Sequence, residues 1–373
     1  MIPYISSLRI DGFRSFKELA VDGLGNVNLI TGMNNSGKSS LLEAIRILVT
    51  GASIKSIFDI LDYREELGVG IDPEKTYLPT EFAPFCSLFN GFPDLQSSQV
   101  GFTIGATGAL PRSFTKISAN IEWFVRKTDP ERPSISYEPA HVDLFGDVDS
   151  FPALNLTIGG RRRVVPLDRL QRRLSTRFDA DIALVPCVYL DPFSSRSTSQ
   201  MGAMWDAIAL TDSEPEIVKA LRVISEDIQA VSMIGSNERS SRSRTAIAKS
   251  SRYSLPVPLR TFGDGVNRLF GIVLSLCSAR NGVLLVDEIE NGLHYSVQVE
   301  IWRTIFRLAK DLSVQVFATS HSWDCVRAFQ IAASDSPEDG VLIRLSARNN
   351  TIIPTLFSEK ELEIATRDQI EVR

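Results

Sequence analysis

The sequence predicts an α/β fold built around a phosphate-binding loop, and three features indicate it. The string GMNNSGKSS, residues 32–40, fits the pattern G-x-x-x-x-G-K-[ST]. An apolar run, Val27–Thr31, precedes this string and an amphipathic segment, residues 40–49, follows it, so strand, loop and helix come in the order that the pattern requires. Two more apolar runs, VLLV at 283–286 and VQVFA at 314–318, are typical of buried parallel strands.

The glycine-rich string carries the groups that bind a nucleoside triphosphate such as ATP. Its glycines let backbone N–H groups turn inward around phosphate, Lys38 supplies a point charge to the β- and γ-phosphates, and the Ser39 hydroxyl can ligate Mg²⁺. A chance glycine turn is the alternative, and the strand and helix on either side argue against it. The expected nucleotide-binding residues are Gly32, Asn34, Asn35, Ser36, Gly37, Lys38, Ser39 and Ser40.

Two carboxylates follow the second apolar run. Asp287 and Glu288 come at the carboxyl end of the predicted strand, which is the edge at which open α/β sheets bind ligands. Asp287 is expected to hold the Mg²⁺ through water. Glu288 points another way because strand side chains alternate, and it is our candidate general base for polarising an attacking water. A surface carboxylate at a strand end is the alternative.

Two further motifs complete the predicted site. His321 follows the third apolar run, where an imidazole can sense a γ-phosphate. An isolated histidine is more often structural, but the neighbouring motifs favour a site role here. The string FGDGVNRL, residues 262–269, opens an apolar helix predicted over 266–279, and its glycines and helix N-terminus again suit an anion.

The four motifs, in this order and at this spacing, resemble the ABC-type ATPase head that the RecF, SMC and OLD (overcoming lysogenization defect) proteins share. The strings ISSLRIDGFRSFKE and DEIENGLH are most similar to the OLD and RecF branch, and within it to short ATPases of the anti-phage and repair type without a Toprim nuclease domain. The resemblance covers residues 1–50 and 255–373. It implies an ABC-type P-loop NTPase head with a mixed β-sheet core, an antiparallel β subdomain and a helical lobe.

In the heads that this chain resembles, the signature loop of one protomer caps the γ-phosphate that the other protomer binds. The resemblance therefore implies that Gly263, Asp264 and Gly265 act in trans on ATP bound at Lys38, within a homodimer or a higher homo-oligomer. The usual signature has a serine where this chain has Gly263. A hydroxyl donor is therefore missing, although backbone N–H groups can still donate.

The resemblance also implies roles outside these loops. Asn291 and Gly292 would line the dimer seam, and Arg14 resembles the family arginine that reaches the nucleotide from the first hairpin. A solvated turn arginine is the alternative for Arg14. Gln96 and Gln99 are candidates in name only for the glutamine loop of such heads.

The remaining chain divides by its patterns. Residues 117–165 alternate like strands of an antiparallel sheet, 183–190 read as another buried strand, and 201–233 have apolar residues at helical spacing. We predict a split ATPase core at 1–50 and 255–373, an inserted segment with antiparallel β elements at 51–200, and a helical lobe with a basic hairpin at 201–254.

The net charge of −5 and the pI near 5.5 argue against a protein that coats nucleic acid, so any contact with double-stranded DNA must be a patch. Two arginine-rich stretches could bind a phosphate backbone, although a solvated or salt-bridged face is the commoner explanation. Their basic residues are Arg161, Arg162, Arg163, Arg169, Arg172, Arg173 and Arg177, and Arg239, Arg242, Arg244, Lys249 and Arg252.

Composition indicates the compartment. Four cysteines without C-x-x-C spacing exclude a zinc hook and suit a reducing environment. No apolar run approaches the ~20 residues that a membrane-spanning helix needs, and the N-terminus does not resemble a signal peptide. We therefore expect a cytoplasmic protein without a membrane partner.

Two functions remain open at this point. In the first, the chain binds and hydrolyses ATP as the sensor or scaffold of an anti-phage defence system, and a separate effector, such as a Toprim or other nuclease, acts on the target. In the second, it is a RecF-like DNA-repair clamp that binds DNA. A third version has ATP merely lock an oligomer. Because the chain after His321 is too short for a Toprim domain and contains no D-x-D pair, we expect any nuclease on a partner chain.

Overall fold

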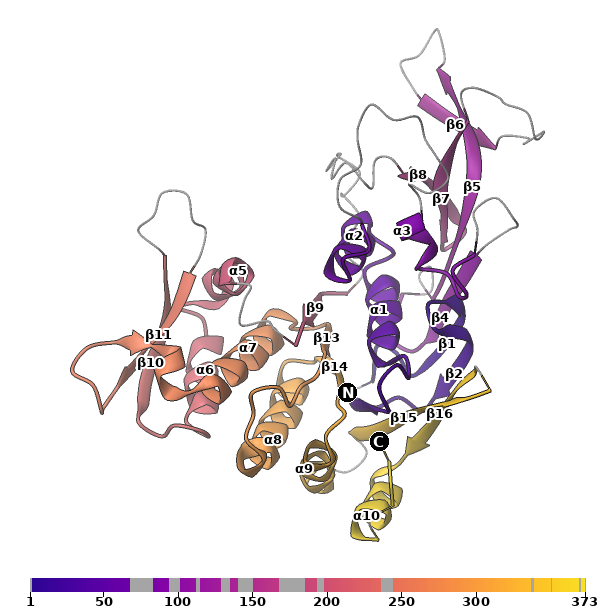
Figure 1. Ribbon diagram of the computed structural model, residues 1–373. Helices are drawn as coiled ribbons and strands as arrows, with labels where there is room; N and C mark the ends of the chain where they lie inside the picture. The colour runs from indigo at the N-terminus through magenta and orange to yellow at the C-terminus, as the bar shows by residue number, and fades with distance from the viewer. Residues whose placement is uncertain are drawn as a thin grey trace.

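The computed structural model describes residues 2–67, 83–93, 101–111, 115–128, 135–139, 150–167, 185–192, 198–235, 244–336, 339–349, 351–368 and 370–372. These residues form a central mixed sheet, a large antiparallel sheet and a small sheet within a separate lobe. Figure 1 shows the antiparallel sheet and the lobe extending from opposite sides of the central sheet. The motifs predicted to bind nucleotide all lie in or beside the central sheet.

The central sheet has six strands in the order β16-β15-β3-β14-β13-β9. β15 pairs in parallel with β3 and antiparallel with β16, so the sheet is mixed, as predicted. β3, β13 and β14 are buried at every residue, which explains why the sequence runs there are almost continuously apolar. The strands are β3 Val27–Thr31, β9 Cys187–Leu190, β13 Val283–Val286, β14 Gln315–Thr319, β15 Gly340–Arg348 and β16 Thr351–Phe357.

Alternate side chains of these strands enter two separate cores. Leu29 and Leu284 face a core that contains α7, α8, α9 and α10, whereas Ile30 and Leu285 face a core that contains α1 and the antiparallel sheet. The sheet is therefore covered on both faces. The helices are α1 Lys38–Val49, α7 Asp264–Ser278, α8 Tyr295–Asp311, α9 Trp323–Ser334 and α10 Glu359–Arg367.

The antiparallel sheet begins at the N-terminus. Its strands follow the order β2-β1-β4-β5-β7-β8, and β6 pairs with β5. The turn of the β1–β2 hairpin lies beside the P-loop, because a Cβ on Gly37 would come within 2.8 Å of Ser15 Oγ. Figure 1 shows α2 beside α1. The elements are β1 Ser7–Phe13, β2 Phe16–Asp22, α2 Ile54–Tyr63, α3 Ala83–Cys86, β4 Gly101–Thr107, β5 Lys116–Thr128, β6 Ile135–Pro139, β7 Ser150–Ile158 and β8 Arg161–Pro166.

The lobe combines two helices with a small sheet. α5 and α6 pack against α7, and the sheet has the order β10-β11-β12. The elements are α5 Thr198–Ile208, α6 Ser213–Leu221, β10 Ile228–Gly235, β11 Arg244–Ser250, β12 Val257–Pro258 and the 3-10 helix η5 Leu259–Phe262. No helix within the described ranges is long and apolar enough to cross a membrane.

The structure corrects three details of the sequence analysis. The helix expected over 201–233 is wrong at its end, because residues 228–235 form β10, in which Val231 and Met233 point to the same buried side. β9 lies in the segment assigned to the insertion, yet it pairs with β13 in the central sheet. The β1–β2 hairpin, assigned to the core, is part of the antiparallel sheet through its pairing with β4.

Candidate nucleotide-binding site

The P-loop connects β3 to α1, and its backbone explains its glycines. Gly32 has a φ of 148°, and a Cβ there would lie 2.5 Å from the carbonyl oxygen of Leu345. Gly37 precedes α1 with a φ of 90°. Neither conformation suits a residue with a side chain. The turn therefore brings the free N–H groups at the start of α1 to face the loop, where they favour an anion.

The side chain of Lys38 folds back onto the P-loop backbone. Its Nζ donates to the carbonyl oxygens of Gly32 and Met33 over 2.7 and 2.9 Å. Burial lowers the pKa of Lys38, and nearby carboxylates, Asp287 first among them, oppose this effect. The ammonium group is thus held at the centre of the loop, within reach of a phosphate bound there.

Asp287 is hydrogen-bonded to the P-loop. The Ser39 hydroxyl donates to Asp287 Oδ2 over 2.9 Å, and Tyr189 donates to the same oxygen over 3.3 Å. The Thr319 hydroxyl donates to Asp287 Oδ1. Asp287 is only 5% exposed, so these bonds replace the water that would otherwise solvate it.

The donor set around Asp287 fits Mg²⁺. This ion takes oxygen ligands in octahedral geometry and usually combines one or two protein oxygens with water and substrate phosphates. Ser39 and Asp287 supply such a pair at the P-loop. Within the described ranges, no cluster of three histidine, cysteine or acidic residues is placed to hold a metal.

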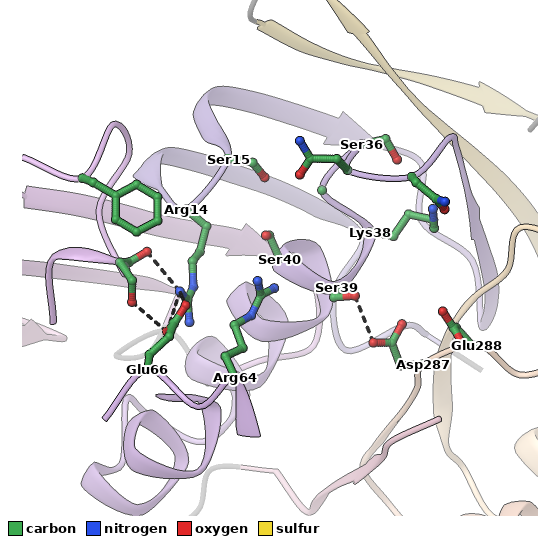
Figure 2. Close-up of a pocket in the computed structure, with 15 residues that line it drawn as sticks. Arg14, Ser15, Ser36, Lys38, Ser39, Ser40, Arg64, Glu66, Asp287 and Glu288 are labelled. Atoms are coloured by element: carbon green, nitrogen blue, oxygen red, sulfur yellow. Dashed lines mark hydrogen bonds and ion pairs between the residues drawn. The ribbon is translucent and has the colours of Figure 1, made fainter. Parts of the chain in front are cut away.

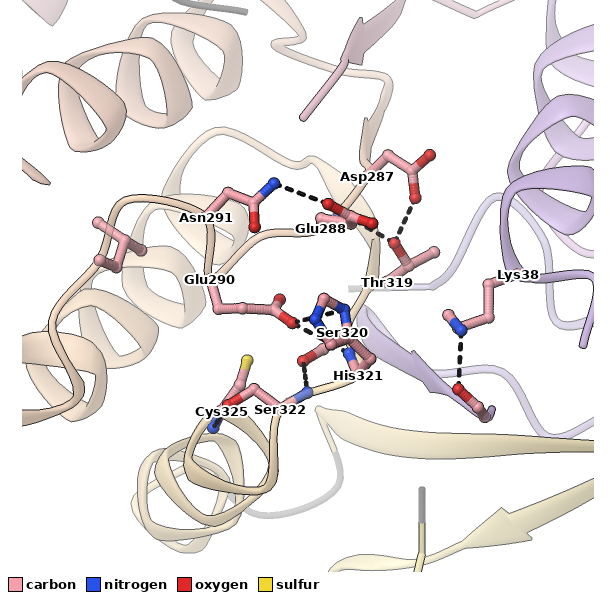
Figure 3. A network of polar contacts seen from close by, with 12 residues as sticks. Lys38, Asp287, Glu288, Glu290, Asn291, Thr319, Ser320, His321, Ser322 and Cys325 are labelled. Atoms are coloured by element: carbon pink, nitrogen blue, oxygen red, sulfur yellow. Dashed lines mark hydrogen bonds and ion pairs between the residues drawn. The ribbon is translucent and has the colours of Figure 1, made fainter. Parts of the chain in front are cut away.

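Glu288 lies beyond β13, which ends at Val286, so the strand alternation from which its direction was predicted does not apply to it. Its φ of 47° marks a sharp turn directly after β13, and its backbone N–H donates to the Thr319 hydroxyl over 2.8 Å. Its carboxylate accepts a hydrogen bond from the Asn291 side chain over 2.7 Å. Glu288 nevertheless lines the same cavity as the P-loop, and Figure 3 shows it on the side of Asp287 that faces Asn291.

His321 lies at the end of β14, the position that the sequence predicts. Its side chain is 51% exposed, and its Nδ1 lies 3.3 Å from Glu290 Oε1. The same carboxylate oxygen accepts the backbone N–H of His321 over 3.0 Å (Figure 3). The imidazole is therefore held at the sheet edge by Glu290 and remains open to solvent.

The signature segment begins α7. Gly263 has a φ of 103° directly before the helix, and a Cβ on Gly265 would lie 3.2 Å from the carbonyl oxygen of Gly292. The two loops assigned to the dimer seam thus pack against each other. Along α7, Arg268 donates to the carbonyl oxygens of Asp287 and Glu288 over 3.0 and 3.1 Å.

A cavity of about 460 Å³ runs along the P-loop. Asp287 and Glu288 lie at one end, and Arg14 and Ser15 lie at the other (Figure 2). Among the described residues, its lining includes none of the signature residues 263–265.

Arg14 lines the cavity but its guanidinium bonds to the protein. It donates to Glu43 over 3.0 Å and to both oxygens of Glu66 over 2.6 and 2.8 Å. Its side chain is 4% exposed, so the solvated-turn alternative is wrong. Burial raises the pKa of Glu43, while the charges of Arg14 and Arg64 oppose that rise. Arg14 therefore supports the wall of the site, while its Nη2 is buried without a hydrogen-bond partner among the described residues.

Sequence reasoning missed four residues of this site. Thr319 lies two residues before His321 at the end of β14, and its place beside Asp287 could have been expected. Arg64 follows α2 and lines the cavity, Tyr189 donates to Asp287 from β9, and Glu290 contacts His321. No sequence pattern marks Arg64 or Tyr189, because each reaches the site through the tertiary fold.

Several predicted residues lie outside the described ranges. They are Gln96, Gln99, Arg169, Arg172, Arg173, Arg177, Arg239 and Arg242. Among the described basic residues, Arg162 forms an ion pair with Glu122, Arg244 with Asp206 and Arg252 with Asp227. These three pairings support the salt-bridged explanation for the residues concerned.

The mixed sheet, with its P-loop and acidic strand end facing one cavity, defines an ABC-type ATPase of the SMC and RecF superfamily. Within that class, the chain belongs to the family described as "AAA domain, putative AbiEii toxin, Type IV TA system", which matches residues 27–324.

Individual relatives agree with this assignment. The "ATP/GTP phosphatase" of Helicobacter pylori is 25% identical over 385 residues, covering 96% of this chain and 97% of the relative. The "DNA replication and repair protein RecF" of Idiomarina loihiensis is 46% identical, but over only 52 residues, or 14% of this chain and 15% of the relative.

Solved structures show the same fold at low identity. A Smc head bound to the C-winged helix domain of ScpA is 13% identical with a TM-score of 0.51, covering 98% of this chain and all of that chain. A Smc head domain with an extended coiled coil, bound to the C-terminal domain of ScpA derived from Pyrococcus furiosus, is 12% identical with a TM-score of 0.50, covering 99% of this chain and all of that chain. The predicted fold class is confirmed.

Proposed function

We propose that the chain binds ATP with Mg²⁺ at the P-loop and hydrolyses it to ADP and phosphate. The hydrogen bond between the Ser39 hydroxyl and Asp287 carries this proposal. It places two oxygen ligands suited to Mg²⁺ 2.9 Å apart, beside a lysine held in a phosphate-binding loop. The name of the Helicobacter pylori relative supports hydrolysis of nucleoside triphosphates.

The P-loop side of the cavity would bind the phosphates. Its backbone N–H groups and Lys38 would hold the β- and γ-phosphates, and Ser39 and Asp287 would hold the Mg²⁺. When bound, the ion neutralises charge that develops on the phosphate oxygens. Arg64, whose side chain is one-third exposed at the cavity wall, adds a second cation near this chain of phosphates.

Glu288 and His321, at the edge of the central sheet, would act on the attacking water and the γ-phosphate. Glu288 can orient this water and accept its proton once the carboxylate exchanges its bond to Asn291 for one to the water. His321 can donate to the γ-phosphate from the end of the neighbouring strand. Catalysis in this reaction class consists mainly of such positioning and of charge stabilisation.

The composite site would form in a homodimer or a larger homo-oligomer. Residues 263–265 of one protomer would cap the γ-phosphate bound at Lys38 of the other, and Asn291 and Gly292 would lie along the seam. The packing of Gly265 on Gly292 supports this arrangement, because it presents both loops as one surface.

In the cell, we propose a cytoplasmic sensor or scaffold of an anti-phage defence system that acts through a separate effector such as a Toprim or other nuclease. The description of the family, which names a toxin and a toxin–antitoxin system, supports this role. The second candidate is a RecF-like repair clamp that binds double-stranded DNA. The short match to a RecF protein supports it, although that match covers a small part of each chain.

Phosphate release tests the proposed activity. The purified chain should release phosphate from ATP only with Mg²⁺ present, and Lys38→Ala should abolish release by removing the charge within the loop. Lys55→Ala, which changes a lysine on the exposed side of α2, is the matched control and should leave the rate unchanged. Equal rates in the wild type and Lys38→Ala would contradict the proposal.

A further inference from the structure

An exposed aromatic ring lines the cavity, on the segment that is hydrogen-bonded to the turn of Arg14. Phe92 lines the cavity and is 71% exposed, so nothing in the described part of the chain covers it. Its φ of 49° is unusual for a bulky residue. Such conformations concentrate at ligand sites, where the surrounding structure enforces them.

The backbone that carries Phe92 is fixed to the N-terminal hairpin. Asn90 donates to the carbonyl oxygens of Gly12 and Arg14, over 2.8 Å in each case. The backbone N–H of Arg14 in turn donates to Leu88 over 3.0 Å. Because this turn lies against the P-loop, Phe92 has a defined position relative to the phosphate site.

A nucleotide bound at the P-loop would extend toward this ring. Figure 2 shows Asp287 and Glu288 on one side of Ser39, with Arg14 and Ser15 on the other. The γ-phosphate belongs beside the acidic pair, since the metal and the attacking water act there. The sugar and the base must therefore leave toward the opposite end.

Ser15 gives a second, independent indication of a ligand at this end. Its hydroxyl oxygen is buried and has no hydrogen-bond partner among the described residues. It lies directly beside the loop, since a Cβ on Gly37 would come within 2.8 Å of it. A buried hydroxyl without a partner is costly, and a ligand oxygen in the cavity would satisfy it.

We propose that Phe92 is the platform on which the nucleotide base stacks, and that the Ser15 hydroxyl donates to the sugar or the α-phosphate. This inference rests on the proposed function, because it requires a nucleotide at the P-loop. Every base has a π-face, so stacking tolerates different bases and favours the larger purines. The ring would be covered by the base on binding, which explains its exposure in the free chain.

Binding measurements separate the ring from the phosphate site. We would titrate the wild type and Phe92→Ala with Mg²⁺–ATP and with inorganic tripolyphosphate, which has the phosphates but no base. Phe92→Ala should weaken ATP binding about tenfold, because stacking is lost, and leave tripolyphosphate binding unchanged. Leu210→Ala removes another exposed apolar side chain, away from the cavity, and should change neither affinity.

A tryptophan at the same position gives a second readout. In Phe92→Trp, ATP should quench the added indole emission relative to the wild type, while tripolyphosphate should not. Unchanged ATP affinity in Phe92→Ala, or an equal loss for both ligands, would overturn the inference and leave the proposed function standing. If the wild type bound neither ligand, both proposals would fall.

Discussion

At the residue scale, Thr319 organises the acidic end of the site. Its hydroxyl donates to Asp287 and accepts the backbone N–H of Glu288, so one side chain sets the relative orientation of both carboxylates. It lies on the strand next to theirs and is fully buried. The candidate metal ligand and the candidate base are therefore positioned by a residue that need not touch the nucleotide.

Thr319→Val tests this role with little change in shape. The substitution removes the donor to Asp287 and leaves the buried N–H of Glu288 without its acceptor. We expect the free energy of unfolding to fall by about 1–3 kcal/mol and turnover to fall about tenfold. Chemical denaturation and phosphate release would measure the two effects. Thr355→Val, on the exposed side of β16, is the control, and an unchanged turnover in Thr319→Val would refute the assigned role.

Residues differ in how far the sequence could predict them. The P-loop and the acidic pair could be predicted, because their spacing follows from the ligand that they would hold. Arg64 could not, because it reaches the cavity only after α2 packs beside α1. The contacts of Arg14 with Glu43 and Glu66 join separate segments, so no local sequence pattern predicts them. The catalytic and nucleotide-binding roles of the individual residues stay predictions.

At the element scale, Arg268 ties the signature helix to the acidic strand. It projects from α7 and donates to the carbonyl oxygens of Asp191, Asp287 and Glu288. Burial lowers the pKa of this arginine, and the acidic groups around it oppose the effect. A movement of α7 would therefore act directly on the backbone that carries Glu288.

Arg268→Met keeps the length of the side chain and removes its donors. We expect a loss of about 2–3 kcal/mol in the free energy of unfolding, because buried carbonyl groups lose a charged donor. Turnover should fall as well, since Glu288 loses a support. Thermal unfolding and phosphate release would show both effects. Arg280→Met, at an exposed position after α7, should match the wild type, and wild-type behaviour of Arg268→Met would exclude the coupling.

Strands whose sequences are continuous apolar runs could be predicted, whereas β10 could not. The central strands are buried on both faces, so their sequences are apolar runs that could be recognised. β10 follows α6 closely and contains a register shift between Ile228 and Ala230. The irregular spacing of its apolar residues therefore resembled a continuing helix, and only pairing with β11 distinguishes the two.

At the scale of the whole molecule, the signature segment and the phosphate loop belong to different parts of the chain. The signature helix packs with the lobe, whereas α1 packs between the central and antiparallel sheets. The described residues that line the cavity include none of the signature residues 263–265. In our proposal, a second copy of the chain supplies them.

Mixing two inactive variants tests this composite site. Lys38→Ala removes the phosphate-binding charge, and Gly265→Asp places a carboxylate in the signature loop, so each homodimer should be inactive. In a mixed dimer, one of the two sites combines an intact Lys38 with an intact Gly265. Mixing should therefore restore phosphate release to about a quarter of the wild-type rate, since half of the dimers are mixed and half of their sites are intact. If the mixture stays inactive while both chains still assemble, capping in trans is wrong.

The most direct test of the central claim compares phosphate release by the wild type and by Glu288→Gln, with the mass of each in solution measured in ATP and Mg²⁺. Removal of the candidate general base should lower turnover by about 10²–10⁴-fold while ATP binding persists, so the closed dimer should accumulate in the variant. Full turnover in Glu288→Gln would contradict the assigned mechanism. Loss of ATP binding in the variant would contradict the assignment of Glu288 to hydrolysis and not to ATP binding.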